Sequence, residues 1–343
     1  MYHERFAYGI RAYSILLRMR LIIRSLFLHR VTVLALVSMV AVPTCFGWGA
    51  EGHRLVNRIA AENLPADAPA FLKTPAAIDE IEYLGPEPDR WRSLAEPELN
   101  SAQAPEHFID LEVADRIGPL PRRRLDYIAE LYATAIVHPE WARDLEPEHA
   151  GFQPYVTNEV YERLHAAFRE YRTLHAQGGD TKPVEAAIIF YAGWLGHYVG
   201  DGSQPLHVTV NYDGWLAHDN PHQYTTQHGV HWQFEGTFVA ANLHERDVAP
   251  LVAPVNIVSD PFAGYLAYLR HSATFVERVY QLDKAQGFAG AGTAESRQFT
   301  AERLAAGASE LRDLIYTAWL DSAKPVPERH TEENPDSSKS SGQ

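Results

Sequence analysis

The residues best suited to chemistry lie in one short run, residues 197–207, which reads HYVGDGSQPLH. His197 and Asp201 are four residues apart at the end of an apolar segment with helical periodicity, so both side chains point from one face of the expected helix. A turn at Gln204 then delivers His207. Ligands at positions i and i+4 are a common way for a helix to bind zinc. Taken alone, this pair is equally compatible with a polar helix end that binds no metal.

A second pair has the same spacing. His231 and Glu235 (HWQFE) are also four apart on an expected helix, and His228, one turn before, is an additional candidate ligand. A solvated helix face with a His–Glu ion pair is the alternative for this pair alone. Two such pairs flanking a third histidine, His207, form a much rarer arrangement and indicate a metal site.

Composition limits the ligands and the partners. The chain has 17 histidines and one cysteine, so a metal site must use imidazole and carboxylate groups, which suits zinc. Without residues 1–47, which hold six of the 30 Lys+Arg and one of the 44 Asp+Glu, the formal net charge is −19. This acidity disfavours broad electrostatic capture of duplex nucleic acid. A phosphate ester held by metal ions stays compatible, because bound cations reverse the local field.

Residues 1–47 have the organisation of a secretory signal peptide. Six arginines and only one acid come with an apolar run at 31–42, which is too short for a comfortable membrane span. A retained anchor and a lipoprotein site at Cys45 are the alternatives. We expect cleavage near Gly47 and Trp48, a periplasmic or secreted protein, and no stable membrane insertion after processing.

Cleavage there would make Trp48 the first residue of the mature chain. A free α-amino group has a pKa of about 8, so it can lose its proton and, with the carbonyl oxygen, chelate a metal. His53 follows closely. Asp89 (in PDRWR) and His107 (in HFID) are further candidates. Taken singly, Trp48 could instead be a core aromatic and His53 a helix-start residue. Asp89 could be a turn residue and His107 a structural histidine.

Helical periodicity dominates the chain after the leader. It covers residues 53–63, 122–145, 158–177, 183–199, 228–246, 261–282 and 294–322. No segment alternates convincingly with period two, and we find no internal repeat or clear interdomain linker. The pattern predicts one all-α domain over residues 48–323. Residues 324–343 are polar, with Pro, Glu and Ser, and predict a disordered tail.

Five motifs occur in order across residues 48–235, namely WGxxGH, PDxWR, HFID, HxxGDxxQPLH and HxxxE. Together they resemble the zinc-dependent single-strand nucleases of the S-one/P-one type, which share a superfamily with the bacterial zinc phospholipases C. The resemblance covers most of the mature chain. Its fourth motif is highly specific and PDxWR is the least specific. It implies the single-domain helical fold of that superfamily.

The resemblance also implies three zinc ions and a division of roles. The implied ligands are Asp89, His107, His197 and Asp201 for one ion; the Trp48 amine and carbonyl, His53 and the same Asp201 for a second; and His207, His231 and Glu235 for the third. The centre of catalysis would be Asp201 with Asp89, His107 and His197, where two clustered ions activate a bridging water. Phe108 and Asp110 match positions that stack on a base and hydrogen-bond to it.

The chain departs from the nuclease pattern at several points. Glu235 stands where the fungal nucleases have Asp and the phospholipases have Glu, the fungal cysteines are absent, and the segment between His107 and His197 is long. The spacing from Trp48 to His53 is nuclease-like. We expect an exported, monomeric zinc phosphodiesterase that acts on single-stranded RNA and DNA and on 3′-nucleotides. The alternatives are a zinc phospholipase C acting on phospholipid headgroups and a zinc-storage protein without catalysis.

Overall fold

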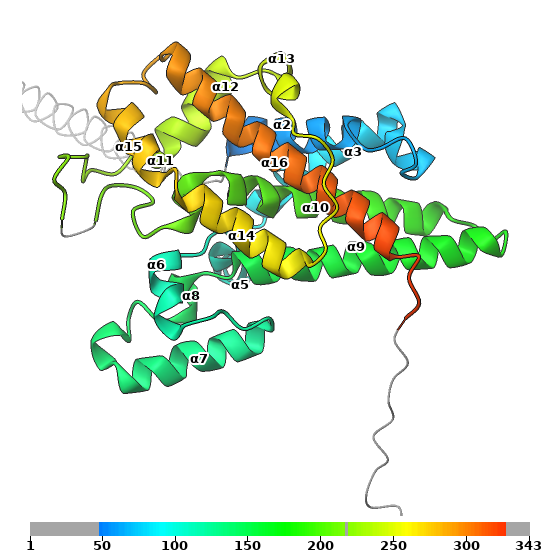
Figure 1. The fold of residues 1–343 in the computed structure, drawn as a ribbon, viewed down its shortest axis with the longest axis horizontal. Helices are drawn as coiled ribbons and strands as arrows, with labels where there is room; N and C mark the ends of the chain where they lie inside the picture. Colours follow the sequence, from blue (N-terminus) through cyan, green and yellow to red (C-terminus); the bar gives the residue numbers. More distant parts are fainter. Residues whose placement is uncertain (1–47, 217–218, 327–343) are drawn as a thin grey trace, which may run out of the picture. The chain divides into compact units, whose positions relative to one another are not determined.

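The computed structural model describes residues 48–216 and 219–326 (Figure 1). The leader expected at 1–47, and the part of the expected tail beyond residue 326, lie outside the described residues. Within the described part the chain is helical and has no strand, only isolated bridges at Ile109–Gly151 and Tyr212–Gly214. The all-α fold class predicted from the sequence is therefore confirmed.

The α-helices in chain order are α2 (Gly49–Glu62), α3 (Pro75–Leu84), α4 (Glu87–Arg90), α5 (Pro97–Gln103), α6 (Leu111–Ala114), α7 (Arg124–Val137), α8 (Pro147–Ala150), α9 (Gln153–Ala176), α10 (Lys182–Ser203), α11 (Val230–Trp232), α12 (Val239–Asn242), α13 (Glu245–Val248), α14 (Pro261–Ala273), α15 (Val276–Lys284) and α16 (Ala294–Asp321). The 3₁₀ segments are η1 (Ala70–Lys73), η2 (Ala104–His107), η3 (Asp115–Ile117), η4 (Pro139–Trp141), η5 (Pro205–Val208) and η7 (Ala249–Leu251). The element η6 (Gln233–Phe238) is a π-helix.

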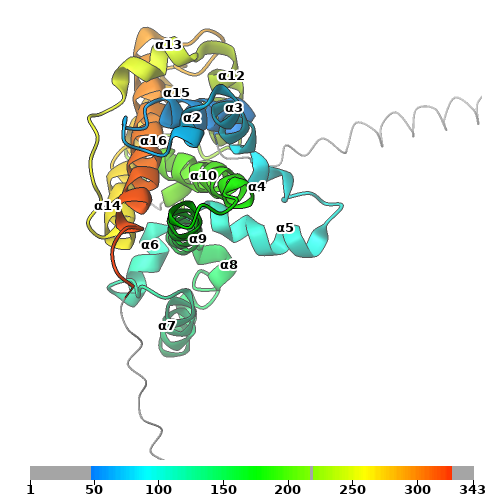
Figure 2. The ribbon, with the colours of Figure 1, turned by 90° about the vertical axis from the view of Figure 1, so that its right-hand side faces the viewer.

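Helix α10 is the central element of the described domain. It packs against α9, α16, α3 and α2, and Figure 2 shows it surrounded by these helices. Close packing needs glycine on its surface: a Cβ on Gly196 would overlap the Asn57 side chain of α2, and one on Gly193 would overlap Leu84 of α3. Because neighbours cover α10 on several sides, its last two turns are buried, and with them His197 and Asp201.

Several expected helices are shorter than the periodicity predicts. The helix expected at 122–145 ends at Val137, because Pro139 has no N–H and cannot continue it. The helix expected at 261–282 is divided into α14 and α15 at Thr274, whose hydroxyl donates to the His271 carbonyl at 2.6 Å. The helix expected at 228–246 is replaced by α11, η6, α12 and α13.

Candidate metal centre

The last turns of α10 place His197 and Asp201 on one buried face, as the four-residue spacing predicts. His197 donates its Nδ1–H to the Gly85 carbonyl at 2.8 Å. Because a carbonyl can only accept, this bond leaves the Nε2 lone pair of His197 directed toward Asp201, 3.3 Å from its Oδ2. The ring is thus oriented by the backbone in the way that metal-binding histidines usually are.

The segment after α3 delivers Asp89. Its carboxylate is buried, and Oδ1 lies 3.8 Å from both His107 Nδ1 and His197 Nε2. Neither carboxylate oxygen has a hydrogen-bond partner among the described residues. Burial is the main cause that raises the pKa of Asp89, to about 7, and the nearby Asp201 adds to it. A cation at this position would remove that penalty by stabilising the ionised form.

His107, at the end of η2, completes the first group with Asp89 and His197. Its Nδ1 lies 3.1 Å from Asp201 Oδ2 and 2.9 Å from His197 Nε2. Burial lowers the pKa of His107 well below the usual histidine value, which favours the neutral ring that a metal ligand requires.

His53, from α2, forms the second group with His197 and Asp201. Its ring stacks on that of His197 with centroids 4.0 Å apart, and its Nε2 lies 3.3 Å from Asp201 Oδ1. Both ring nitrogens lack a hydrogen-bond partner in the described part of the chain. Burial, followed by repulsion from His197, lowers the pKa of His53, so this ring is also kept neutral.

Asp201 lies between the two groups. Its Oδ1 faces His53, and its Oδ2 faces His107 and His197, all within 3.3 Å. Burial alone would raise the pKa of Asp201, but the surrounding histidines, with His197 and His207 foremost, hold it well below the usual range. The residue is therefore a buried carboxylate that stays ionised.

The third group consists of His207, His231 and Glu235. His207 Nε2 and His231 Nε2 are 3.2 Å apart, and Glu235 Oε2 lies 3.3 Å from the former and 2.7 Å from the latter. Each of the two rings has its Nδ1 bonded to a backbone carbonyl, that of His107 at 2.7 Å and that of Tyr212 at 3.0 Å. In neutral rings with this orientation two lone pairs face each other, an arrangement that a cation between them would stabilise.

The charges around the third group agree with this geometry. Burial alone would lower the pKa of His207, but Asp201 and Glu235 outweigh it and raise the pKa to about 9. Burial likewise acts to raise the pKa of Glu235, but attraction to His231 and His207 lowers it overall. The position between these side chains therefore favours positive charge.

Gln204 is a site residue that sequence reasoning missed, because it treated Gln204 only as part of a turn. Its Nε2 donates to Glu235 Oε2 at 2.7 Å, and its Oε1 accepts the Leu206 N–H at 2.6 Å. The side chain therefore ties the turn before His207 to the carboxylate of the third group. The presence of an amide between two expected ligands, in an otherwise apolar turn, is the signal that could have identified it.

The N-terminal residues of the described chain lie against the same site. The Trp48 indole is fully buried and donates to Ser203 Oγ of α10 at 2.7 Å. Gly49 has a φ of +56°, and a Cβ there would lie 3.3 Å from Gly236 Cα, next to Glu235. Since this backbone passes close to both α10 and the π-helix η6, Trp48 is held between the elements that carry the three groups.

Two expected residues flank the groups without belonging to them. Phe108 and Asp110 directly follow His107 and are half-buried. Burial, with smaller contributions from Glu112 and Asp144, raises the pKa of Asp110 to about 7. His228, by contrast, is 81% exposed and pairs with Asp213 at 3.3 Å, so the structure does not place this additional candidate with the third group.

The three groups satisfy a simple test of fit to metal ions. Within the described residues, unpartnered buried nitrogen and oxygen atoms include both ring nitrogens of His53, both oxygens of Asp89, His107 Nε2, Asp201 Oδ1 and Glu235 Oε1. Buried polar atoms are normally satisfied, so their concentration here requires an explanation. Imidazole and carboxylate donors of this kind suit zinc.

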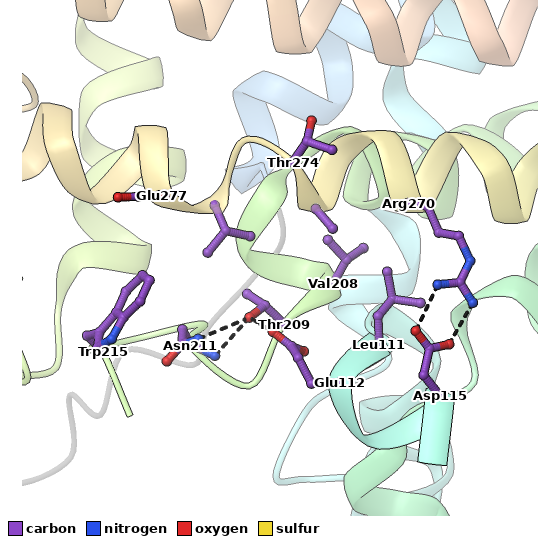
Figure 3. A pocket seen from close by; sticks show the side chains of 12 residues that line it. Leu111, Glu112, Asp115, Val208, Thr209, Asn211, Trp215, Arg270, Thr274 and Glu277 are labelled. Carbon is purple, nitrogen blue, oxygen red and sulfur yellow. Dashed lines mark hydrogen bonds and ion pairs between the residues drawn. The ribbon is translucent and has the colours of Figure 1, made fainter. Parts of the chain in front are cut away.

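A separate pocket lies beside η5, which carries His207. It has a volume of about 450 Å³ and is lined by residues of α6, η3, η5, the following loop, α14 and α15 (Figure 3). Its charged residues are Glu112, Asp115, Glu277 and Arg270, with Arg270 paired to Asp115 through two hydrogen bonds. Three carboxylates against one guanidinium disfavour a phosphate ester here, which leaves the metal-binding groups as the better place for one.

A helical domain with three adjacent buried His/carboxylate groups defines a class of proteins able to hold clustered metal ions. The S1/P1 Nuclease family matches residues 48–330, so the chain belongs to this family and is a hydrolase of the nuclease type. This finding confirms the resemblance predicted from the five motifs. Comparisons with curated proteins and with solved structures give no match.

Proposed function

We propose that the chain is an exported, zinc-dependent phosphodiesterase that hydrolyses single-stranded RNA and DNA, and also 3′-nucleotides, at a site of three zinc ions. The observation that carries the proposal is the convergence of three buried ligand groups in a member of a nuclease family. The ligands proposed are those expected from the sequence, namely Asp89, His107, His197 and Asp201; Trp48, His53 and Asp201; and His207, His231 and Glu235.

Asp201 is proposed as the ligand shared by the first two ions. The two groups found by geometry have His197 in common rather than Asp201. However, the Nδ1 of His197 is bonded to the Gly85 carbonyl, which leaves a single nitrogen lone pair and so one metal bond. A carboxylate has two oxygens, and those of Asp201 face His53 on one side and His107 on the other. The number of available ligand atoms therefore favours Asp201, and not His197, as the residue that bridges the two ions.

The amine and carbonyl of Trp48 are proposed as ligands on the support of their position. The carbonyl oxygen accepts the Gly52 N–H at 3.2 Å and keeps its second lone pair for a metal. The buried indole, bonded to Ser203, fixes the residue against α10. This role requires that cleavage after Gly47 produce a free amine, so we propose that processing completes the site.

When bound, the zinc ions would lower the pKa of a bound water toward neutrality and neutralise charge on the phosphoryl oxygens. The chain's own contribution is to fix the ligands. The Nδ1 bonds of His197, His207 and His231 to backbone carbonyls hold each ring in one orientation. Asp201 is kept ionised, while burial keeps His53 and His107 neutral, so each presents its ligand form.

Phe108 and Asp110 are proposed to recognise a base. Phe108 is partly exposed directly after His107, so a base stacked on it would lie beside the first group. Stacking needs an accessible base face, which favours unpaired strands over a duplex. The Asp110 carboxylate has no hydrogen-bond partner among the described residues and is available to a base edge.

We also propose that the protein is exported and retains no membrane anchor. No helix in the described part of the chain is long and apolar enough to cross a membrane. The basic, apolar leader at 1–47 supports a secreted or periplasmic location.

The test is a parallel assay of the processed protein, with zinc content measured in the same sample. We expect about three zinc ions per chain and faster cleavage of single-stranded RNA and DNA than of duplex. Phe108→Ala should raise KM for oligonucleotides, whereas Phe190→Ala, a control on α10, should not. Turnover of phosphatidylcholine alone would instead assign a phospholipase C, and zinc without hydrolysis of any phosphodiester would assign metal storage.

The role of Trp48 has its own test. A version that retains an N-terminal extension should bind one zinc ion fewer than the processed protein and lose most activity. Full zinc content and activity in the extended form would contradict the amine as a ligand.

A further inference from the structure

Helix α7 has a continuous apolar stripe that faces solvent. Leu125 is 69% exposed, Tyr132 52% and Ile136 82%, and the exposed Ala129 lies between them on the same face. An isolated exposed apolar residue is ordinary, but a contiguous stripe of large ones marks an interaction surface. Both views place α7 at the periphery of the described domain (Figures 1 and 2).

The opposite face of α7 already packs on the rest of the molecule. Tyr127 and Leu131 are fully buried there, and Tyr127 stacks on Tyr155 of α9 with ring centroids 4.7 Å apart. The helix is thus apolar on two sides, although a surface helix needs only one apolar face to pack on its own core. Contacts within this chain therefore do not explain why the solvent-facing side of α7 is also apolar.

The spacing of the outer stripe is that of a helix-pairing seam. Residues 125, 129, 132 and 136 follow one another at intervals of four, three and four, which are the d, a, d and a positions of a heptad pattern. Such a stripe fits a single partner helix laid almost parallel or antiparallel to α7.

We propose that the partner is α7 of a second copy of this chain, in antiparallel orientation about a twofold axis near residues 130 and 131. In this register Leu125 of each copy faces Ile136 of the other, and the small Ala129 faces the large Tyr132. At the centre of the seam, the small Ala129 therefore leaves room for the large Tyr132, as close packing between helices requires. A parallel pair would instead place Tyr132 against Tyr132 and Ala129 against Ala129.

The charges near both ends of α7 also favour a second copy of this helix in antiparallel orientation. Arg122 and Arg123, 61% and 73% exposed, directly precede α7 and pair with Asp260 and Asp126 of the same chain. Glu140, 61% exposed and 3.3 Å from His138, lies just beyond the end of α7. Antiparallel pairing brings these opposite charges together and opposes the two helix dipoles. A lipid surface is a poorer occupant, because Asp126 and Glu130 flank the stripe and the chain as a whole is acidic.

This proposal replaces our expectation of a monomer and does not depend on the substrate. Helix α7 has 14 residues and spans about 21 Å, so the seam is short. Interfaces at the lower end of the size range are usually weak and transient. We therefore expect a monomer–dimer equilibrium in the micromolar range rather than a permanent dimer.

The first experiment measures mass by sedimentation equilibrium over increasing concentrations of the exported protein. We expect the mass to double, and Leu125→Glu or Ile136→Glu to keep it at the monomer value. Leu251→Glu, the same kind of change at a residue 37% exposed on η7, should leave dimerisation intact. A parent chain that stays monomeric up to about 100 µM, or a dimer that survives both α7 variants, overturns the proposal.

The second experiment tests the register with single cysteines and does not rely on charged variants. Across the proposed axis the two copies of residue 129 are offset by about 4.5 Å along the seam, and those of residue 136 by about 16 Å. Ala129→Cys should therefore form a disulfide-linked dimer on mild oxidation, and Ile136→Cys should not. Disulfide formation by both variants would show parallel pairing, and either that result or cross-linking by Ile136→Cys alone would refute the register.

Binding of the α7 stripe to a membrane can be distinguished from dimerisation. Flotation with phosphatidylcholine vesicles would detect it: binding by a monomeric parent chain that Ile136→Glu abolishes would assign the stripe to a membrane and exclude the dimer. Zinc content and circular dichroism of each variant identify any loss of fold.

Discussion

Replacing Asp201 by asparagine is the sharpest test of the proposed site, because it removes one charge and almost no volume. In the structure this carboxylate contacts His53 through one oxygen, and His107 and His197 through the other. If it bridges two ions, the substitution removes a ligand from both. An asparagine has only one acceptor oxygen, and its amide nitrogen cannot bind a cation.

The expected magnitude follows from these contacts. Zinc content should fall from about three ions per chain to about one, the ion held by His207, His231 and Glu235. In chelator, Asp201→Asn removes the charge from the acceptor of the 3.1 Å hydrogen bond to His107, and so at most the contribution of a charged hydrogen bond. Such a bond contributes roughly 1–3 kcal/mol, so Tm should fall by about 2–12 °C in a domain of this size. The increase in Tm on adding zinc should drop to about a third.

The assay combines elemental analysis with thermal unfolding, each with zinc and with chelator. Glu235→Gln, a change of the same kind in the third group, should cost one ion rather than two. Asp260→Asn is the matched control outside the site, since this carboxylate only caps α14 and pairs with Arg122. It should leave zinc content unchanged.

Equal loss of zinc in Asp201→Asn and Glu235→Gln would refute Asp201 as a bridge. Unchanged zinc content in Asp201→Asn would refute the whole assignment of the first two groups.

Three further predictions address packing, pH and orientation. Gly196→Ala forces a methyl group against Asn57, whose amide donates to two backbone carbonyls, so the free energy of unfolding should fall by about 2–4 kcal/mol; an unchanged urea midpoint would contradict this. Asp110 has a pKa of about 7 in the folded chain against 3.8 as its ordinary value, so the folded state binds more protons between these values and stability falls as pH rises through them. Asp110→Asn should therefore raise Tm at pH 8 much more than at pH 4, and a pH-independent difference would count against the buried carboxyl. Gln204→Leu should weaken zinc binding about 10–100-fold in a chelator competition, because Glu235 loses its orienting donor; unaltered competition would show that the amide plays no such part.

Much of the fold could be predicted because helical periodicity is local. The pairs His197 with Asp201, and His231 with Glu235, need only the pitch of a helix to share a face, and the structure places both pairs as expected. The all-α class and the family follow from the same kind of short-range pattern.

Helix ends were predicted less well because they depend on competition between local bonds and packing. Thr274 divides the segment expected at 261–282 by hydrogen bonding back to a carbonyl, which hydrophobic spacing does not reveal. The π-helix at Glu235 could not be predicted for a similar reason. One extra residue in a turn changes the direction of a side chain without changing the composition.

By itself, the sequence determined which residue types could bind metal, that no thiolate but Cys45 was available to them, and which residues one helix would present together. Tertiary structure decided that His53, Asp89 and His107, from three separate elements, would meet at α10, a grouping that the sequence implied only through its resemblance to a family. It also decided that Gln204 would hold Glu235 and that α7 would expose its second apolar face. The reason is that ligand grouping and exposure depend on contacts between residues far apart in the chain, and no local periodicity encodes which surfaces those contacts cover.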